Sequence, residues 1–285
     1  MLYASPYTCL DRVDGGLMSQ KAGQAAARES QRSARCRNAA PEADSGDPMD
    51  GEDLVRLNEP GALAVLCAVL SKVFSYPTVS QAQDLADVES MEYCTMLAGR
   101  AGVNAGDLCD AEAEFAQVSA GFGRLSSERA VSPAMPGQIE GWRQIRLDMT
   151  RLFFSPLTGI PMEGRHWVPK GNRDWRAAQV GERASVARAY ADFGFRLAAK
   201  VSTQEDSLDN ELEFVSLLAS REARALAGAD SVTAARCRDL RREFFRCHLR
   251  DLGTGVAGRI MGESSSPHLR YYAQVLLLVL DRIGE

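Results

Sequence analysis

Apolar residues recur at spacings of three and four from about residue 52 onward, which is the period of an amphipathic helix. The first such stretch begins at Asn58, where a capping residue precedes Pro60 in the first helical turn, and it ends at Pro77. No strand-like alternation and no internal repeat accompanies this pattern, which predicts an all-α protein. Further helices are expected at 80–99, 107–125, 137–154, 182–200, 208–226, 232–251 and after Pro267.

Glycines, prolines and polar residues interrupt the helical pattern at several places. The segment 155–181 is rich in Pro and Gly and is predicted to be one long irregular loop, a feature that is often functional. A polar break predicts a hinge near 201–206, and a flexible hinge permits domain swapping, so a monomer or a swapped dimer is expected. Gly253 and Gly255 are expected to interrupt the helix at 232–251.

Residues 1–50 differ from the remainder of the chain. They are rich in Ala, Ser, Arg, Gly and Asp and carry little periodic apolar content, so they cannot bury enough surface to offset the entropy of ordering. The sequence therefore predicts a disordered extension over 1–50 and one helical domain over 52–285. Met18 and Met49 are alternative candidates for the first translated residue.

The composition of the chain disfavours several classes of function. The 285 residues are 45% hydrophobic and 25% charged, as in ordinary globular proteins, and the net charge of −5 disfavours a nucleic-acid partner. The longest apolar run, 275–280, is far shorter than the roughly 18 to 20 residues of a membrane span, and no secretory signal precedes it, so a cytoplasmic protein is expected. The seven cysteines have no paired spacing and are interpreted as reduced, small hydrophobic residues.

The chain carries no motif that is typical of catalysis. It has three histidines and lacks the HExxH metal motif, the GxSxG elbow, a Walker-type loop and a GxGxxG motif after a strand. His248, on a helix beside Phe244, is more typical of a core or interface residue than of a catalyst. An enzyme, a metal and a cofactor are therefore not expected, and binding of another protein is the predicted function.

Four stretches resemble, in order, the segments of one protein family over about 60–280. LSKVFSYP at 70–77 is similar to the end of the family's first helix, and DMTRLFFSP at 148–156 to its acidic-x-x-Arg-Leu-Phe-x-x-Pro segment. EDSLDNELEF at 205–214 resembles its acidic hinge motif, Asp-His-x-x-x-Glu-Leu-x-Phe, and FFRCHLRDL at 244–252 resembles its Phe-x-x-x-His-Leu-x-x-Trp helix. By these motifs the chain resembles the TorD/DmsD family of cytoplasmic chaperones for molybdenum-containing redox enzymes, which is related to the NarJ-type assembly factors.

Three positions depart from the family pattern. Ser207 stands where the hinge motif has a histidine, Leu252 stands where the last motif has a tryptophan, and IPMEGRHWV at 160–168 replaces a Pro-Tyr-Glu-Ser type of loop. These departures indicate a divergent branch with its own client.

The resemblance implies about ten helices and binding of a partner's N-terminal twin-arginine signal peptide until the partner's molybdopterin cofactor is inserted. Such a peptide joins a basic patch to an apolar, helix-prone stretch, which a groove between helices accommodates. The carboxylates of Asp206, Asp209 and Glu211 are expected to meet its arginines through charge-assisted contacts. The residues expected to bind the client are Arg151, Leu152, Phe153, Asp206, Ser207, Asp209, Glu211, Phe244 and His248.

Three alternatives remain open from the sequence. Within the superfamily, the chain is alternatively a NarJ-like factor for a nitrate reductase-type enzyme on the cytoplasmic side. A helical enzyme or small-ligand-binding protein would need a polar cavity with perturbed titratable groups. A DNA-binding regulator is disfavoured because the chain is acidic and lacks a helix-turn-helix signature.

Overall fold

Helices α3 (Glu59–Phe74) and α9 (Leu208–Ala227) pack along each other at the centre of the molecule. The computed structural model describes residues 10–12, 58–75, 78–127, 136–155, 159–168, 175–197 and 204–284. The remaining helices are α4 (Val79–Leu85), α5 (Val88–Arg100), α6 (Cys109–Ser127), α7 (Pro136–Phe154), α8 (Trp175–Asp192), α10 (Ser231–Phe244), α11 (Arg250–Glu263) and α12 (Pro267–Gly284). Short turns of 3-10 helix cover Ala105–Leu108 (η2) and Gly164–His166 (η3).

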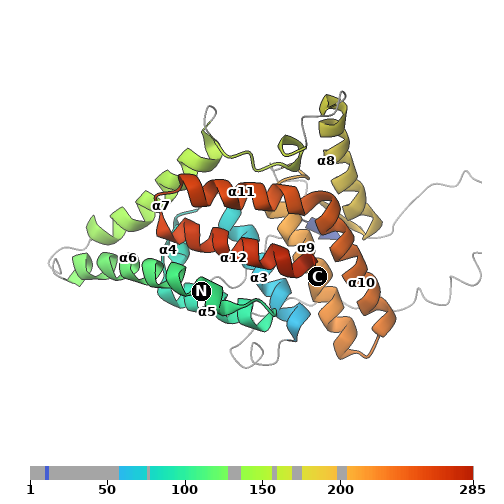
Figure 1. Cartoon of the computed structure of the whole chain (residues 1–285), viewed down its shortest axis with the longest axis horizontal. Helices are drawn as coiled ribbons and strands as arrows, with labels where there is room; N and C mark the ends of the chain where they lie inside the picture. The colour runs from blue at the N-terminus through green and yellow to red at the C-terminus, as the bar shows by residue number, and fades with distance from the viewer. Residues whose placement is uncertain are drawn as a thin grey trace, which may run out of the picture.

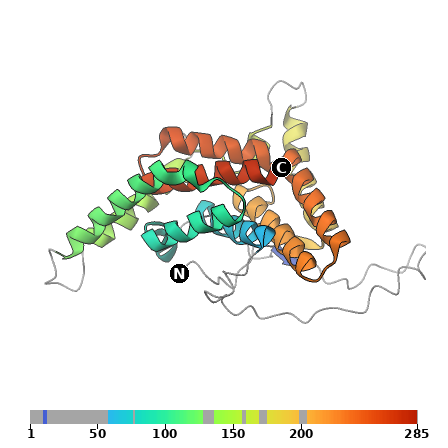
Figure 2. The same ribbon diagram turned by 60° about the horizontal axis from the view of Figure 1, so that its bottom comes forward.

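The helices pack as one all-α domain, as predicted (Figure 1). α11 and α12 run side by side as a hairpin joined at Ser264–Ser266, while α6 and α7 project together from one end of the molecule in both ribbon views (Figures 1 and 2). α9 and α10 form a second hairpin, and α10 lies with α8 on the side of the molecule away from α6 and α7 (Figure 1).

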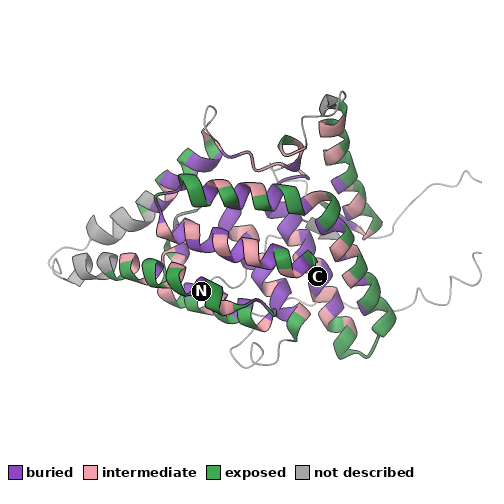
Figure 3. Cartoon of the chain, in the orientation of Figure 1, coloured by how far each residue is buried: buried purple, intermediate pink, exposed green. Residues whose placement is uncertain are grey.

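The core lies where α3, α9 and α12 meet. Their inner faces are buried, whereas α8 and α10 present mostly exposed residues on their outer sides (Figure 3). The apolar stripe along α12 explains its position, because Leu269, Tyr272, Leu276 and Leu280 are all buried.

The helix predicted at 80–99 is two helices, which is a correction. The first ends at Leu85, and Asp87 caps the second, since its Oδ2 accepts a hydrogen bond from the Ser90 backbone N–H at 3.1 Å. Thr78 caps α4 in the same way, with Gln81 completing a capping box. The helix predicted at 107–125 is found as α6, Cys109–Ser127.

The predicted loop 155–181 is shorter than expected, because α8 already begins at Trp175. α8 also ends earlier than the predicted residue 200, and Gly194, with φ of 77°, turns the chain after it. There a three-residue strand, β2 (Phe195–Leu197), pairs antiparallel with β1 (Leu10–Arg12), a pairing that the sequence did not predict. The remainder of 1–50 lies outside the described residues, so its predicted disorder stays a prediction.

Gly253 and Gly255 do not end a helix, contrary to expectation. One continuous helical run extends from α10 through a π-helical turn, η4 (Phe245–Leu249), into α11. Both glycines allow close packing instead: a Cβ at Gly253 would meet the Leu280 side chain, and a Cβ at Gly255 would collide with the Trp167 ring. Glycine is therefore needed in α11 for packing rather than for a turn.

No helix in the described ranges is both long enough and apolar enough to cross a membrane. Among the cysteines that the structure describes, Cys67, Cys94 and Cys237 are buried, while Cys109 and Cys247 are exposed, and all five are free thiols.

Candidate partner-binding site

The start of α9 gathers the acidic residues of the predicted hinge motif. Asp206, Asp209 and Glu211 are all buried, and the exposed fraction of Asp206 and of Glu211 is 0%. Ser207, the N-cap residue, donates its hydroxyl to the Asp209 carboxylate. Three carboxyl groups within six residues thus lie inside the protein rather than on its surface. We name Asp206, Asp209 and Glu211 the carboxylate cluster.

An extended segment covers the carboxylate cluster. We name Ile160–Val168 the cover segment. Its Gly164 N–H donates to the backbone oxygen of Asp206 at 2.6 Å, and its Met162 oxygen accepts from the Leu208 N–H at 2.9 Å. The Arg165 N–H donates to Asp206 Oδ2 at 3.0 Å. These bonds hold the cover segment across the first turn of α9.

The cover segment is also attached to α11 through Trp167. The indole N–H of Trp167 donates to the Pro161 oxygen at 3.0 Å, which folds the segment back on itself. The indole ring occupies the space that a side chain at Gly255 would take. The cover segment can therefore lie against α11 only because residue 255 is a glycine.

Glu211 is the least satisfied member of the carboxylate cluster. Neither of its carboxyl oxygens has a hydrogen-bond partner among the described residues. Burial, together with the charges of Glu182, Asp206 and Asp209, raises the pKa of Glu211 well above its ordinary value. A Cβ at Gly164 would lie 3.3 Å from Glu211 Oε1, a close contact, so the glycine lets the cover segment pass near this carboxyl group.

The pKa of Asp209 is also raised, again mainly because burial disfavours the charged form, while the Ser207 hydroxyl lowers it in part. Perturbed carboxyl groups of this kind concentrate at functional sites. Asp206 Oδ1 is a further buried acceptor without a partner in the described part of the chain. The carboxylate cluster therefore has unused acceptor capacity that a cationic group could fill.

His248 connects the carboxylate cluster to a neighbouring groove. It lies in the π-helical turn η4, and its Nδ1 is 2.6 Å from Oε1 of Glu182 on α8. Glu182 is close enough to Glu211 to raise the pKa of that group. Turns of π-helix often occur at functional sites, because the extra residue changes where the side chains of a helix point.

The groove runs between α8 and α10 and has a volume of about 270 Å³. Its apolar lining includes Phe193, Phe214, Leu240 and Phe244, and its polar lining includes Arg188, Asp192, Glu243 and His248. The Phe244 ring packs on Phe214 with centroids 4.8 Å apart. We name this feature the α8–α10 groove. Its aromatic floor and charged rim resemble grooves that accept an amphipathic helix.

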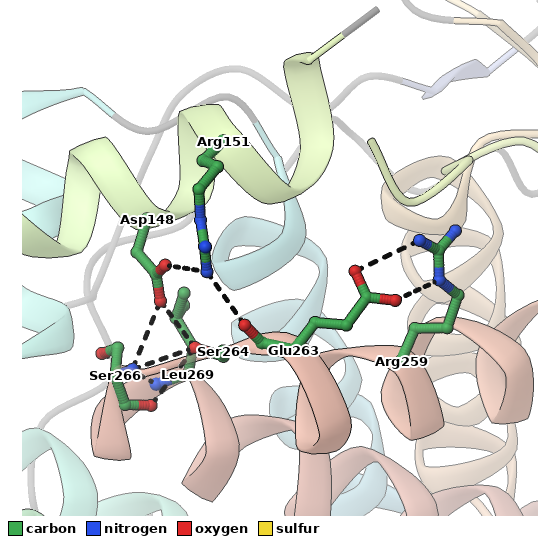
Figure 4. Close-up of polar contacts among 7 residues, drawn as sticks. All are labelled: Asp148, Arg151, Arg259, Glu263, Ser264, Ser266 and Leu269. Carbon is green, nitrogen blue, oxygen red and sulfur yellow. Dashed lines mark hydrogen bonds and ion pairs between the residues drawn. The ribbon is translucent and has the colours of Figure 1, made fainter. Parts of the chain in front are cut away.

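Arg151, from the second motif, has a different environment (Figure 4). It donates to Asp148 Oδ1 at 3.0 Å and to the backbone oxygen of Glu263 at 2.9 Å. Buried Asp148 also accepts from the Ser264 hydroxyl at 2.6 Å and the Ser266 N–H at 3.3 Å. The acidic-x-x-Arg pattern thus fastens α7 to the junction of α11 and α12.

Replacing Asp148 by alanine is expected to destabilise the protein by roughly 2–4 kcal/mol, because several hydrogen bonds to a buried charged group are lost together. Urea unfolding followed by circular dichroism measures the change. Thr150→Ala, on the exposed side of the same helix turn, is the matched control and should change stability by less than about 0.5 kcal/mol. Equal effects of the two substitutions would contradict the structural role of Asp148.

The structure separates the nine predicted site residues into two groups. It brings Asp206, Ser207, Asp209 and Glu211 together at the start of α9, with His248 and Phe244 at the adjoining groove. Leu152 and Phe153 are buried in the core, and Arg151 belongs to the Asp148 network. The sequence did not predict Glu182, because no motif or spacing marks that residue. It did not predict the packing role of Trp167 either, although a large aromatic residue in a polar loop was a signal for it.

Residues 130–251 match the family model of the nitrate reductase delta subunit. The matched range includes the second and third motifs and nearly all of the fourth. The matched range is less than half of the chain, and it does not single out the TorD/DmsD branch. No curated protein and no solved structure has a significant match to the chain.

Proposed function

We propose that the chain is a cytoplasmic chaperone that binds the precursor or apo form of a molybdopterin oxidoreductase and holds it until the cofactor is inserted. The family match over residues 130–251 supports this class of function. The observation that carries the proposed mode of recognition is the environment of Glu211. This fully buried carboxyl group has no hydrogen-bond partner among the residues that the structure describes, and it lies beside two other buried carboxyl groups.

In the proposal, an arginine of the client's N-terminal segment reaches the carboxylate cluster. A guanidinium group offers five N–H donors in a planar fork, which suits several carboxyl oxygens at once. Its charge also favours the ionised form of Glu211, whose pKa is raised in the free protein. The cover segment must move for this contact, because Gly164 lies directly over Glu211.

The apolar part of the client segment then lies in the α8–α10 groove. The Glu182–His248 pair joins this groove to the carboxylate cluster, so one continuous segment with arginines followed by apolar residues can occupy both. Phe214 and Phe244 provide the apolar contact. A twin-arginine signal peptide has this order of residues.

The family match also favours a second candidate client. Because the matching model describes the nitrate reductase delta subunit, the client is alternatively a nitrate reductase-type subunit that stays on the cytoplasmic side. The same cluster and groove would then bind a basic N-terminal segment that carries no export signal.

Affinity capture from the native cytoplasm tests the proposal. The full-length tagged chain is expected to enrich the precursor or apo subunit of a molybdopterin oxidoreductase, identified by mass spectrometry. Glu211→Gln should reduce this enrichment, whereas Glu213→Gln, which changes a partly buried carboxylate on the same helix, should not. Reproducible capture of no molybdoenzyme subunit by the folded protein would contradict the proposal, and the presence or absence of a twin-arginine leader on the captured subunit separates the two candidates.

A further inference from the structure

A second cavity, of about 480 Å³, lies where the start of α3, the end of α9, α10 and the end of α12 meet. Four arginines and two glutamates line it: Arg238, Arg241, Arg242, Arg282, Glu59 and Glu222. They are all of the charged residues that line it in the described part of the chain, so these residues give the cavity an excess of two positive charges in a protein whose overall net charge is −5. We name it the arginine cavity.

The two carboxylates neutralise only part of this charge. Glu222, with an exposed fraction of 1%, accepts from Arg238 Nε at 2.8 Å and from Arg241 Nη2 at 3.2 Å. Glu59 pairs with Arg282, whose Nε also donates to the Ala101 backbone oxygen at 3.1 Å. One buried carboxylate is thus shared by two guanidinium groups, which leaves donors available for another anion.

The buried side chain of Arg241 does not have all of its hydrogen-bond partners within the described part of the chain. Its exposed fraction is 7%, and its Nε has no hydrogen-bond partner among the described residues. A buried charged group with an unsatisfied N–H destabilises the folded state, so a structural role alone does not explain this cluster. A bound oxyanion would accept from such donors and balance the charge.

The spacing of the arginines suits one compact anion. Arg238 and Arg242 are four residues apart on α10, and Arg241 lies three residues after Arg238, so all three point from one face of the helix. α3 begins at the same cavity, and the partial positive charge of its N-terminus adds to that of the arginines.

We propose that the arginine cavity binds a phosphate-bearing small molecule. A phosphate monoester carries a charge of roughly −1.5 to −2 near neutral pH, which matches the excess charge of the cavity. Arg238, Arg241 and Arg242 hold the phosphate, and the organic part lies against Pro60 and Leu226. The cavity falls within the range of about 300–1,000 Å³ that small-molecule sites occupy, so it has room for more than a phosphate ion.

Thermal unfolding and calorimetry of the full-length protein with inorganic phosphate and with pyrophosphate test this proposal, with chloride at matched ionic strength as the reference. Saturable binding and a rise in Tm with either phosphate probe are expected, because a ligand that binds only the folded state stabilises it. An equal response to phosphate, pyrophosphate and chloride in the wild-type protein would overturn the proposal without the need for any variant.

Two substitutions locate the binding. Arg242→Gln and Arg238→Gln should each weaken binding of the better phosphate probe by about tenfold or more, which corresponds to about 1.4 kcal/mol. Arg250→Gln removes an exposed arginine beyond the cavity on the following helix and should leave the affinity unchanged. If Arg250→Gln weakens binding as much as the cavity substitutions do, the site proposed here is wrong. The client-binding proposal is unaffected by either result, because it depends on a different set of residues.

Discussion

Replacing Glu211 by glutamine is expected to raise the free energy of unfolding at neutral and alkaline pH by roughly 1–3 kcal/mol. Glutamine has nearly the same shape and no charge, so the variant avoids the desolvation of a carboxylate among three other acidic groups. Because most substitutions at fully buried positions destabilise a protein, a gain here would be a distinctive result.

The pH dependence of this gain has a definite sign. The pKa of Glu211 is raised in the folded protein, so the folded state holds the proton more tightly than the unfolded chain does. Its contribution to stability is fully present below the ordinary glutamate pKa of about 4.3 and is lost as pH rises through the folded pKa, by at most about 1.4 kcal/mol per pH unit. The stability difference between Glu211→Gln and the wild type should therefore widen as pH rises above about 4.3.

Urea unfolding at several pH values measures this difference, with Glu213→Gln as the control. Glu213 lies on the same helix but is only partly buried, so its substitution should give a small change that varies little with pH. A Glu211→Gln variant that is less stable than the wild type at all pH values would show that the carboxyl group has a stabilising partner in the protein.

Replacing Gly255 by alanine is expected to destabilise the protein by roughly 1–3 kcal/mol, since the new methyl group would occupy the place of the Trp167 ring. The cover segment should then separate from α11, and the carboxylate cluster beneath it should become more accessible. In the proposed function, moving the cover segment would cost the variant less free energy than it costs the wild-type protein. The variant should therefore bind an arginine-containing peptide more tightly than the wild type does, although it is less stable.

Gly258→Ala on the same helix is the matched control. Among the described residues, nothing beyond the backbone of α11 itself lies within 4 Å of a Cβ at Gly258, and the residue is exposed. Alanine should therefore stabilise the helix by up to about 1 kcal/mol. Thermal unfolding and hydrogen exchange of the cover segment measure both variants. Similar stability and similar exchange in the two would contradict the role of Trp167 in fastening the cover segment.

Periodicity predicted most helices of this fold, because amphipathic stripes such as that of α12 directly report which face is buried. Periodicity did not predict the helix boundaries that depend on a single residue. Asp87 divides a periodic stretch into two helices by capping the second, and Gly255, which is typical of a helix end, instead admits an indole ring from a segment about 90 residues earlier in the chain.

The site was predictable in part. The acidic motif at 205–214 correctly indicated where carboxyl groups would gather, but it could not show that Asp206 and Glu211 are buried, since their cover comes from residues 160–168. The contact of His248 with Glu182 depends on the π-helical turn in η4, and no residue pattern in the sequence predicts that turn. Contacts between residues this far apart in the sequence can be identified only from the folded structure.

We propose that the carboxylate cluster of α9 recognises arginine in a client segment. Fluorescence anisotropy can test this contact with a labelled peptide in which two adjacent arginines precede an apolar, helix-prone stretch. We expect saturable binding by the full-length wild-type protein, at least about tenfold weaker binding by Glu211→Gln, and unchanged binding by Glu213→Gln. If the wild-type protein and a folded Glu211→Gln variant bind this peptide with equal affinity, the carboxylate cluster does not recognise its arginines.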